Sequence, residues 1–183
     1  TLVLVNGKRR HRSAVITFLG GGLSDGAQGP DISVIPAAAL KQVEVLRDGA
    51  AAQYGSDAIA GVINFVLNDA SEGGSFEARY GSYYEGDGDM IQLSGNVGLP
   101  LSENGFINLS AEYRTADDTS RSIQRDDAAA LIAAGNTFVA DPAQIWGSPE
   151  IKHDIKLFAN AGVELSDTSE AYIFGNFAER EVE

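Results

Sequence analysis

The stretch from Asp31 to Asn68 reads DISVIPAAALKQVEVLRDGAAAQYGSDAIAGVINFVLN, and its turn residues divide it into short elements. Pro36 fixes φ and lacks an amide hydrogen, which suits the first turn of a helix. Residues 36–40 are therefore predicted to form a short helix that begins near Ser33 or Ile35. Residues 42–46 are predicted to form the strand that follows it.

The second half of this stretch continues the alternation of turns and elements. Arg47-Asp48-Gly49 favours a turn with positive φ, and residues 50–54 have the composition of one or two helical turns closed by Gly55. Gly61 precedes residues 62–67, whose apolar, β-branched and aromatic side chains are typical of a strand buried on both faces. Gly49, Gly55 and Gly61 are thus the predicted structural turn glycines.

This stretch resembles the plug domain of the TonB-dependent outer-membrane receptors. The resemblance rests on Val-Glu-Val-Leu-Arg-Asp-Gly at 43–49, Ala-Gln-Tyr-Gly-Ser at 52–56 and Ala-Ile-Ala-Gly-Val-Ile-Asn at 58–64, in that order and spacing. Residues 2–10 are similar to the strand and turn that precede this motif in the family. Together these segments cover about the first third of the chain.

Composition limits the classes of function. The chain has 183 residues, no cysteine and a net charge of -13. Such acidity argues against a nucleic-acid partner, which requires a basic face. The absence of cysteine excludes disulfides and thiolate metal sites but leaves the compartment open. No apolar run of about 18 residues predicts a membrane-spanning helix, whereas a transmembrane β-strand needs only about 9 to 11 residues. Because the chain begins with Thr1, we expect a fragment of a longer protein.

A polar, glycine-bearing connector at 68–75 predicts a domain boundary, with a plug domain at 1–70 and barrel strands at 71–183. Downstream of it the sequence predicts an antiparallel meander. The predicted strands are 76–84, 90–99, 106–115, 155–165 and 171–178. The predicted turns are 85–89, 100–105 and 166–169, and residues 116–154 are predicted to be a long loop with a short helix near 126–135.

Most of these strands alternate between apolar and polar residues, which places the two kinds on opposite faces of a sheet. Ile91, Leu93, Val97 and Leu99 alternate with Gln92, Ser94 and Asn96. Alternating short turns and long loops are typical of outer-membrane barrels, in which the loop at 116–154 and the turn at 85–89 would lie outside and the short turns in the periplasm. A soluble antiparallel sheet with one wet face has the same period and remains the alternative.

A glycine-rich segment lacks both the P-loop ending and the dinucleotide fingerprint, so a flexible loop is the favoured interpretation. If the resemblance holds, this loop lies at the outer apex of the plug and contacts a ligand. The candidate ligand-facing residues are Gly20, Gly21, Gly22, Ser24, Asp25 and Gln28.

Glu44 and Arg47 bracket an apolar strand end, where charge is costly without a partner. The resemblance implies that these positions lock the plug to the barrel wall, and a surface pair beside a turn is the alternative. The turn at 85–89 lacks the glycine and glutamate spacing of a calcium loop, and His11 and His153 have no second ligand nearby in sequence. No motif indicates catalysis, and no metal or cofactor is expected.

The sequence therefore predicts a mainly β chain with short helices, in which an α+β plug precedes antiparallel strands of an incomplete transmembrane β-barrel. The resemblance implies a non-enzymatic receptor in the Gram-negative outer membrane that takes up a siderophore, cobalamin or glycan. Its expected partners are the lipid bilayer, the rest of the barrel and TonB, which would contact a segment upstream of this chain. The alternative is a soluble or surface β-rich binding module. Because its open strands leave backbone groups unpaired, the isolated fragment is expected to self-associate.

Overall fold

The computed structural model describes residues 1–13, 26, 28–47 and 51–183, which form two β-sheets with short helices. The predicted fold class is confirmed. By its contacts the chain divides into a first unit of residues 1–77, 94–112 and 156–178 and a second unit of residues 78–93, 113–155 and 179–183. Each unit is described by itself below.

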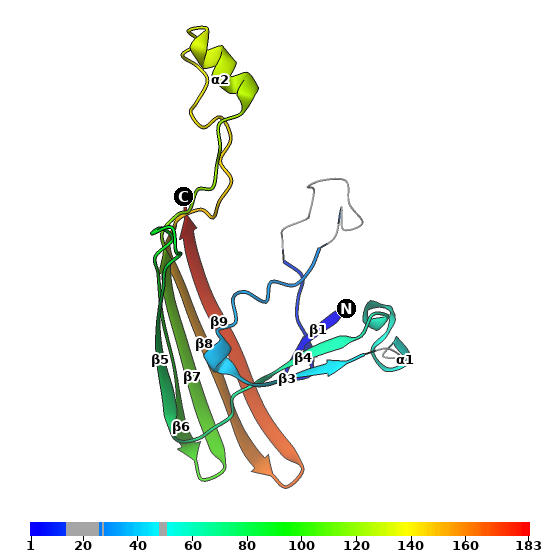
Figure 1. Cartoon of the computed structure of the whole chain (residues 1–183). Helices are drawn as coiled ribbons and strands as arrows, with labels where there is room; N and C mark the ends of the chain where they lie inside the picture. The colour runs from blue at the N-terminus through cyan, green and yellow to red at the C-terminus, as the bar shows by residue number, and fades with distance from the viewer. Residues whose placement is uncertain (14–25, 27, 48–50) are drawn as a thin grey trace. The chain divides into compact units, whose positions relative to one another are not determined.

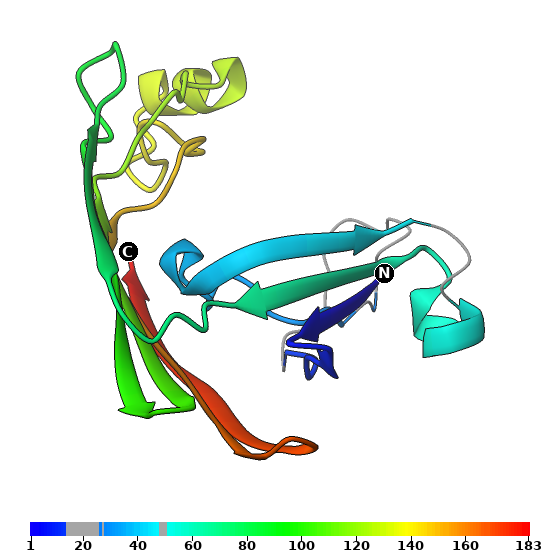
Figure 2. The ribbon, with the colours of Figure 1, turned by 90° about the horizontal axis from the view of Figure 1, so that it is seen from below.

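The N-terminal sheet has the strand order β2-β1-β4-β3. Its strands are β1 (Leu2–Val5), β2 (Lys8–Arg9), β3 (Leu40–Leu46) and β4 (Val62–Leu67). β1 runs parallel to β4, with Leu2 opposite Val62, whereas β3 runs antiparallel to β4, with Val43 opposite Phe65. Figure 2 shows these directions, because the arrowheads of β1 and β4 point one way and that of β3 the other.

Turn residues shape this sheet. Asn6 and Gly7 both have positive φ, 46° and 72°, and join β1 to β2. Pro36, with φ of -65°, caps the 3-10 helix η1 (Ala37–Ala39). Gly55 has φ of 83° and separates α1 (Ala51–Tyr54) from η2 (Ser56–Ala58). At Gly61, where φ is 111°, a Cβ would lie 2.5 Å from the Leu46 carbonyl oxygen, so only glycine fits. Gly49 lies outside the described residues.

Two apolar clusters hold the N-terminal sheet. One joins Leu2, Leu4, Val62 and Ala58, with Tyr54 packed against it. The other joins Val5, Leu67, Ile35 and Ala39 with Phe158, a residue of a later strand. Consecutive strand residues such as Leu4 and Val5 point to opposite faces, so each face carries one cluster. β4 was predicted to be buried on both faces; its end residues are buried, and the four between them are half-buried.

The meander sheet has its five strands in chain order, side by side in Figure 1. They are β5 (Gly74–Gly81), β6 (Met90–Ser102), β7 (Gly105–Ala116), β8 (Ile151–Ser166) and β9 (Ser169–Val182). Helix α2 (Asp126–Ala133) lies in the connection between β7 and β8. None of the helices in the described residues has the length and apolarity needed to span a membrane.

Two predicted boundaries were wrong. The predicted turn at 100–105 shrinks to Glu103 and Asn104, because β6 continues through Pro100. Gly98 N donates to Gly73 O, which lies just before the first residue of β5. Pro100 therefore has no β5 residue opposite it, and its missing amide hydrogen costs the sheet no hydrogen bond. The predicted loop at 116–154 is also shorter, since β8 begins at Ile151. Polar residues lie on both faces of the first part of β8, so the sequence shows no alternation of apolar and polar residues there.

Burial in the meander sheet is inverted relative to a water-soluble sheet. On β7 the side chain of Leu109 is 41% exposed, whereas Asn108 and Ser110 are 2% and 6% exposed. On β8, Leu157 is 47% exposed and Asn160 only 4%. On β7 and β8 one face is therefore mainly apolar and open, and the opposite face is mainly polar and covered.

Candidate functional sites: the linker junction and an arginine-lined cavity

The linker, defined as residues 68–73, crosses the covered face of the meander sheet within the first unit. Gly98 on β6 makes this crossing possible. A Cβ at Gly98 would lie 2.9 Å from the carbonyl carbon of Ala70 and 3.0 Å from the amide nitrogen of Glu72. Such distances are shorter than van der Waals contact, so the linker backbone fits against β6 only beside a glycine.

Four asparagines hold the linker in place, and we call them the asparagine clamp: Asn68, Asn96, Asn108 and Asn160. The Asn68 side-chain amide donates to Asn96 Oδ1 at 3.1 Å, and the Asn96 amide donates to Asn108 Oδ1 at 2.5 Å. The Asn160 amide donates to the Asn68 carbonyl at 3.0 Å. Asn96 of β6 therefore binds the Asn68 side chain, and Asn160 of β8 binds the Asn68 backbone carbonyl.

The clamp satisfies linker groups that would otherwise lack partners. The Asn108 amide also donates to the Ala70 carbonyl at 3.3 Å, while Asn68 Oδ1 accepts from the Ala70 amide at 3.1 Å. Asn96 reaches Ser110 Oγ at 2.8 Å. Buried polar groups that each have a partner rigidify a junction, whereas a broken network carries a large penalty.

Apolar and charged contacts extend the junction beyond the linker. Phe158 of β8 is buried with Val5 and Leu67, and Phe174 of β9 packs against the same cluster. Arg10 donates from both terminal guanidinium nitrogens to Asn176 Oδ1 of β9 at 3.4 Å. Lys156 and Glu112 form a buried ion pair between β8 and β7 at 2.5 Å. The N-terminal sheet and the covered face are thus joined by both packing and hydrogen bonds.

The site residues that the sequence predicted are not part of the asparagine clamp. Glu44 is exposed on β3 and accepts hydrogen bonds from Gln42 and Asn64, both in the N-terminal part of the chain. Arg47 follows β3 and is exposed, and among the described residues no partner pairs with it. The side-chain amide of Gln28 donates to the Ser13 carbonyl at 2.6 Å. The other members of the predicted ligand loop, Gly20 to Asp25, lie outside the described residues.

We expect Asn96→Leu to lower the free energy of unfolding of the full-length protein by about 1–3 kcal/mol, because Asn68, Asn108 and Ser110 lose a partner at a part-buried site. Urea unfolding in detergent micelles measures this change. Gln92→Leu on the same strand is the matched control, since Gln92 makes no hydrogen bond to the linker within the part of the chain that is described. Equal stability of the two variants would show that the clamp contributes nothing.

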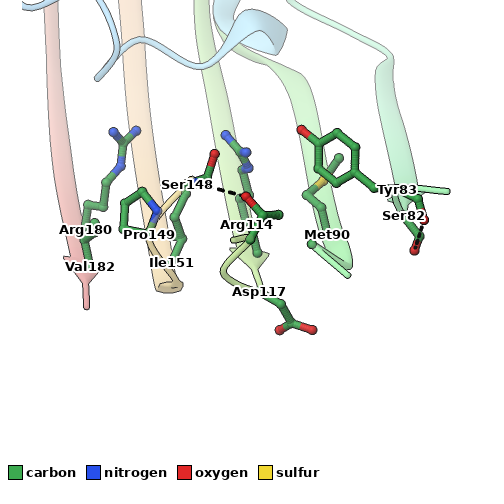
Figure 3. Close-up of a pocket in the computed structure, with 14 residues that line it drawn as sticks. Ser82, Tyr83, Met90, Arg114, Asp117, Ser148, Pro149, Ile151, Arg180 and Val182 are labelled. Atoms are coloured by element: carbon green, nitrogen blue, oxygen red, sulfur yellow. Dashed lines mark hydrogen bonds between the residues drawn. The ribbon is translucent and has the colours of Figure 1, made fainter. Parts of the chain in front are cut away.

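The second unit contains a cavity of about 490 Å³, which we call the arginine-lined cavity. Its walls come from the ends of all five meander strands and from the loops beside them. The lining residues labelled in Figure 3 are Ser82, Tyr83, Met90, Arg114, Asp117, Ser148, Pro149, Ile151, Arg180 and Val182. In that view the guanidinium groups of Arg114 and Arg180 point the same way, whereas the carboxylate of Asp117 points away from them.

The two arginines differ in their partners. Arg180 donates from Nε and Nη2 to Asp154 Oδ2 at 2.9 and 2.6 Å, and the Asp154 side chain is 2% exposed. Arg114 Nε is shielded from solvent and has no hydrogen-bond partner. Within the described residues, no carboxylate is paired with Arg114. The charge of Arg180 is therefore balanced, and that of Arg114 is not.

One rim of the cavity is fixed by contacts that we call the loop latch: Arg121 with Asp87, Glu85 and Tyr83. Arg121 Nη2 donates to Asp87 Oδ1 at 2.8 Å and to Glu85 Oε2 at 3.3 Å, and its guanidinium lies 5.7 Å from the centre of the Tyr83 ring. The latch thereby connects the β5–β6 loop to the β7–β8 loop. The hydrogen bond from Arg121 holds the pKa of the Asp87 carboxyl below its ordinary value.

Arg121→Gln should accelerate amide exchange in residues 83–89 by only about two- to fivefold, since exposed ion pairs contribute little to stability. The lowered folded-state pKa of Asp87 means that the latch is fully formed above its ordinary pKa of 3.8 and is lost as pH falls through the folded value. Hydrogen-exchange mass spectrometry tests both effects. Arg125→Gln, which removes the Asp127 pair on the same loop, should leave residues 83–89 unchanged.

The described residues contain no group of three or more His, Cys, Asp or Glu side chains suited to a metal ion. The Glu85 and Asp87 carboxylates of the calcium-like turn instead pair with Arg121. His153 lies near two carboxylates of β9: its Nε2 is 3.7 Å from Glu179 Oε1, and its Nδ1 is 3.5 Å from Glu181 Oε2.

Comparison with known proteins agrees with this geometry. Residues 1–62 match the family model described as TonB-dependent Receptor Plug Domain. The chain is 36% identical over 90 residues to the vitamin B12 transporter BtuB of Photobacterium profundum, and the match covers 49% of this chain and 14% of that protein.

Solved structures share the fold of nearly the whole chain. The ferric enterobactin receptor PfeA of Pseudomonas aeruginosa, a point mutant bound to enterobactin, is 19% identical with a TM-score of 0.64 and covers 98% of this chain and 25% of its own. PfeA in complex with BCV-L6 is 18% identical with a TM-score of 0.67, covering 99% of this chain and 25% of its own. This chain thus spans a quarter or less of these proteins. The sequence of residues 1–62 is thus similar to the plug domain of TonB-dependent receptors, and the chain as a whole shares the fold of the matching part of the PfeA structures.

Proposed function

We propose that this chain is part of an outer-membrane receptor that takes up a scarce substrate with energy supplied through TonB. The observation that carries the proposal is the inverted burial of the meander sheet beside a plug-domain sequence. An open apolar face suits lipid, and a polar covered face suits a lumen that contains a plug. A water-soluble sheet would place Leu109 inside and Asn108 outside.

The proposed organisation has a plug at 1–70 and barrel wall at 71–183, with the connection at 117–150 on the outer side. The junction supports this division, because the linker is the last segment before the meander sheet and is fixed to it by the asparagine clamp. A pull on the plug through TonB would therefore act on segments upstream of a fixed end. Glu44 and Arg47 remain proposed contacts to parts of the wall beyond this chain.

The substrate classes that fit are cobalamin and ferric siderophores, since the relatives are a vitamin B12 transporter and ferric enterobactin receptors. A glycan remains the third class. The loop of Gly20 to Gln28 is proposed to contact the ligand at the outer apex of the plug. Unchanged ligand affinity after exchange of this loop for a short linker would contradict its role.

Uptake measurements test the proposed function. Cells lacking their own receptors for the two substrates would carry the full-length gene, and accumulation of radiolabelled cyanocobalamin and ferric enterobactin would be followed with and without a protonophore. We expect one substrate to bind in both conditions and to accumulate only without protonophore. Accumulation that does not depend on proton-motive force or on TonB would contradict the proposal.

A second candidate, a soluble β-rich binding module without catalytic activity, makes the opposite prediction for the isolated chain. The chain by itself leaves 12384 Å² accessible, against about 8,500 Å² for a compact monomer of its mass. We therefore expect the isolated chain to self-associate or to require detergent. Light scattering that shows a stable monomer in plain buffer would favour the soluble module.

A further inference from the structure

We propose that the N-terminal sheet opens away from the meander sheet along β9 during uptake, while the linker stays fixed and acts as the hinge. This inference rests on the proposed receptor function and specifies which edge of a pulled plug gives way. The contacts on which it depends all lie within the first unit. They differ in quality between the linker end and the β9 end of the junction.

The linker end of the junction is tightly held. Asn96 and Asn160 each hydrogen-bond Asn68, at 3.1 and 3.0 Å, and Asn108 donates to the Ala70 carbonyl at 3.3 Å. These groups are partly buried, so breaking one bond leaves a donor or acceptor without a partner. The close crossing at Gly98 adds backbone contact along β6. The linker is therefore the part of the junction that resists displacement.

The polar contacts at the β9 end are long. Arg10 donates from both terminal nitrogens to one oxygen, Asn176 Oδ1, at 3.4 Å, which is longer than an ordinary hydrogen bond. Lys8 Nζ lies 5.9 Å from the centre of the Tyr172 ring, near the outer limit of a cation–π contact. Arg10 Nε is shielded from solvent without an acceptor, so separation of Arg10 from β9 would let water satisfy it.

Apolar packing lies between these two ends. Val5 and Leu67 of the N-terminal sheet are buried against Phe158 of β8, whereas Phe174 of β9 is only partly buried at the margin of the cluster. Apolar packing is not directional, so it resists separation more than a small rotation. The sheet can therefore tilt about the linker and leave Phe174 before it leaves Phe158.

A cavity of about 580 Å³ already separates the N-terminal sheet from the turn ends of β8 and β9, and we call it the seam cavity. Lys8, Asn160, Glu164, Glu170 and Tyr172 are among its lining residues. Glu164 and Glu170 are exposed, so water can enter. Opening along β9 therefore widens a polar space, whereas opening at the linker would break the asparagine clamp.

Two reversible cross-links in the full-length receptor test the hinge. One joins Lys8→Cys to Glu170→Cys, from β2 to β9, and the other joins Asp69→Cys to Asn104→Cys, from the linker to the β6–β7 turn. All four positions are exposed and line the seam cavity, so each link is the steric control for the other. A bis-methanethiosulfonate reagent with a short spacer forms the links, and a reducing agent removes them. Mass spectrometry of the linked peptides measures the yield.

Both double variants should accumulate substrate before cross-linking, because substitutions of exposed side chains change stability little. We expect the link between positions 8 and 170 to abolish uptake in the cross-linked fraction, and the reducing agent to restore it. The link between positions 69 and 104 should leave the uptake rate unchanged. Binding of substrate to cells treated with a protonophore should be equal in all forms, because neither link changes the outer side.

Loss of uptake with both links would show that the whole N-terminal sheet leaves its place and would overturn the hinge. Normal uptake with positions 8 and 170 linked would overturn the opening along β9 and leave the receptor function intact. Absence of uptake in the variants without links and in the wild-type protein would count against the receptor function.

Spin-label distances in the purified full-length receptor test the hinge without transport. As urea rises below the unfolding transition, labels at positions 8 and 170 should separate before labels at positions 69 and 104. Separation of both pairs at the same urea concentration would contradict the difference in strength between the two ends of the junction.

Discussion

Gly98→Val is expected to separate the linker from the meander sheet. The valine side chain would overlap the backbone at Ala70 and Glu72, and neither backbone atom can rotate away as a side chain does. Displacing the linker also breaks the hydrogen bond from Asn68 to Asn96. Overpacking and the lost hydrogen bonds together should lower the free energy of unfolding by about 3 kcal/mol or more.

Limited proteolysis and amide exchange at residues 68–73 of the full-length protein measure this displacement. Gly175→Val on β9 is the matched control, because a Cβ at Gly175 meets no atom within 4 Å. We expect cleavage in the linker of Gly98→Val and none in Gly175→Val. Equal protection of the linker in both variants would contradict the close crossing at Gly98.

Leu67→Ala is expected to lower the free energy of unfolding by about 2–5 kcal/mol. Leu67 is 1% exposed and belongs to the cluster that contains Val5 of β1 and Phe158 of β8, so its loss leaves a cavity where the N-terminal sheet meets the covered face. β1 and β4 of the N-terminal sheet and β8 of the meander sheet therefore lose contacts together.

Val43→Ala is the control for Leu67→Ala, because Val43 lies on the neighbouring strand β3 but is 49% exposed. Its replacement should cost less than about 1 kcal/mol. Urea unfolding in detergent, followed by near-ultraviolet circular dichroism, compares the two. Similar midpoints for both variants would show that the apolar cluster does not hold the two sheets together.

Local structure was largely predictable because it depends on residues close together in the chain. Pro36 indicated the start of a short helix, and the alternation from Ile107 to Arg114 indicated a strand with two unlike faces. The predicted turn at 100–105 was wrong because a proline usually ends a strand, whereas Pro100 lies inside β6 at a position with no β5 residue opposite it.

The junction was not predictable, because it depends on the register between distant strands. The alternation placed Asn96 on a polar face of its strand, but not next to Asn68. Gly98 gave no sequence signal of the backbone that crosses it. The balanced charge of Arg180 and the unbalanced charge of Arg114 likewise depend on side-chain directions that no sequence pattern contains.

Spin-label accessibility on β7 tests most directly whether the meander sheet is a membrane wall. The chain contains no cysteine, so Leu109→Cys and Ser110→Cys each supply a single labelling position within it. In liposomes containing the full-length protein, the label at 109 should be highly accessible to oxygen and inaccessible to a water-soluble nickel chelate, whereas the label at 110 should be shielded from oxygen. A label at 109 that is shielded from both reagents would place Leu109 in a packed protein core and contradict the receptor account.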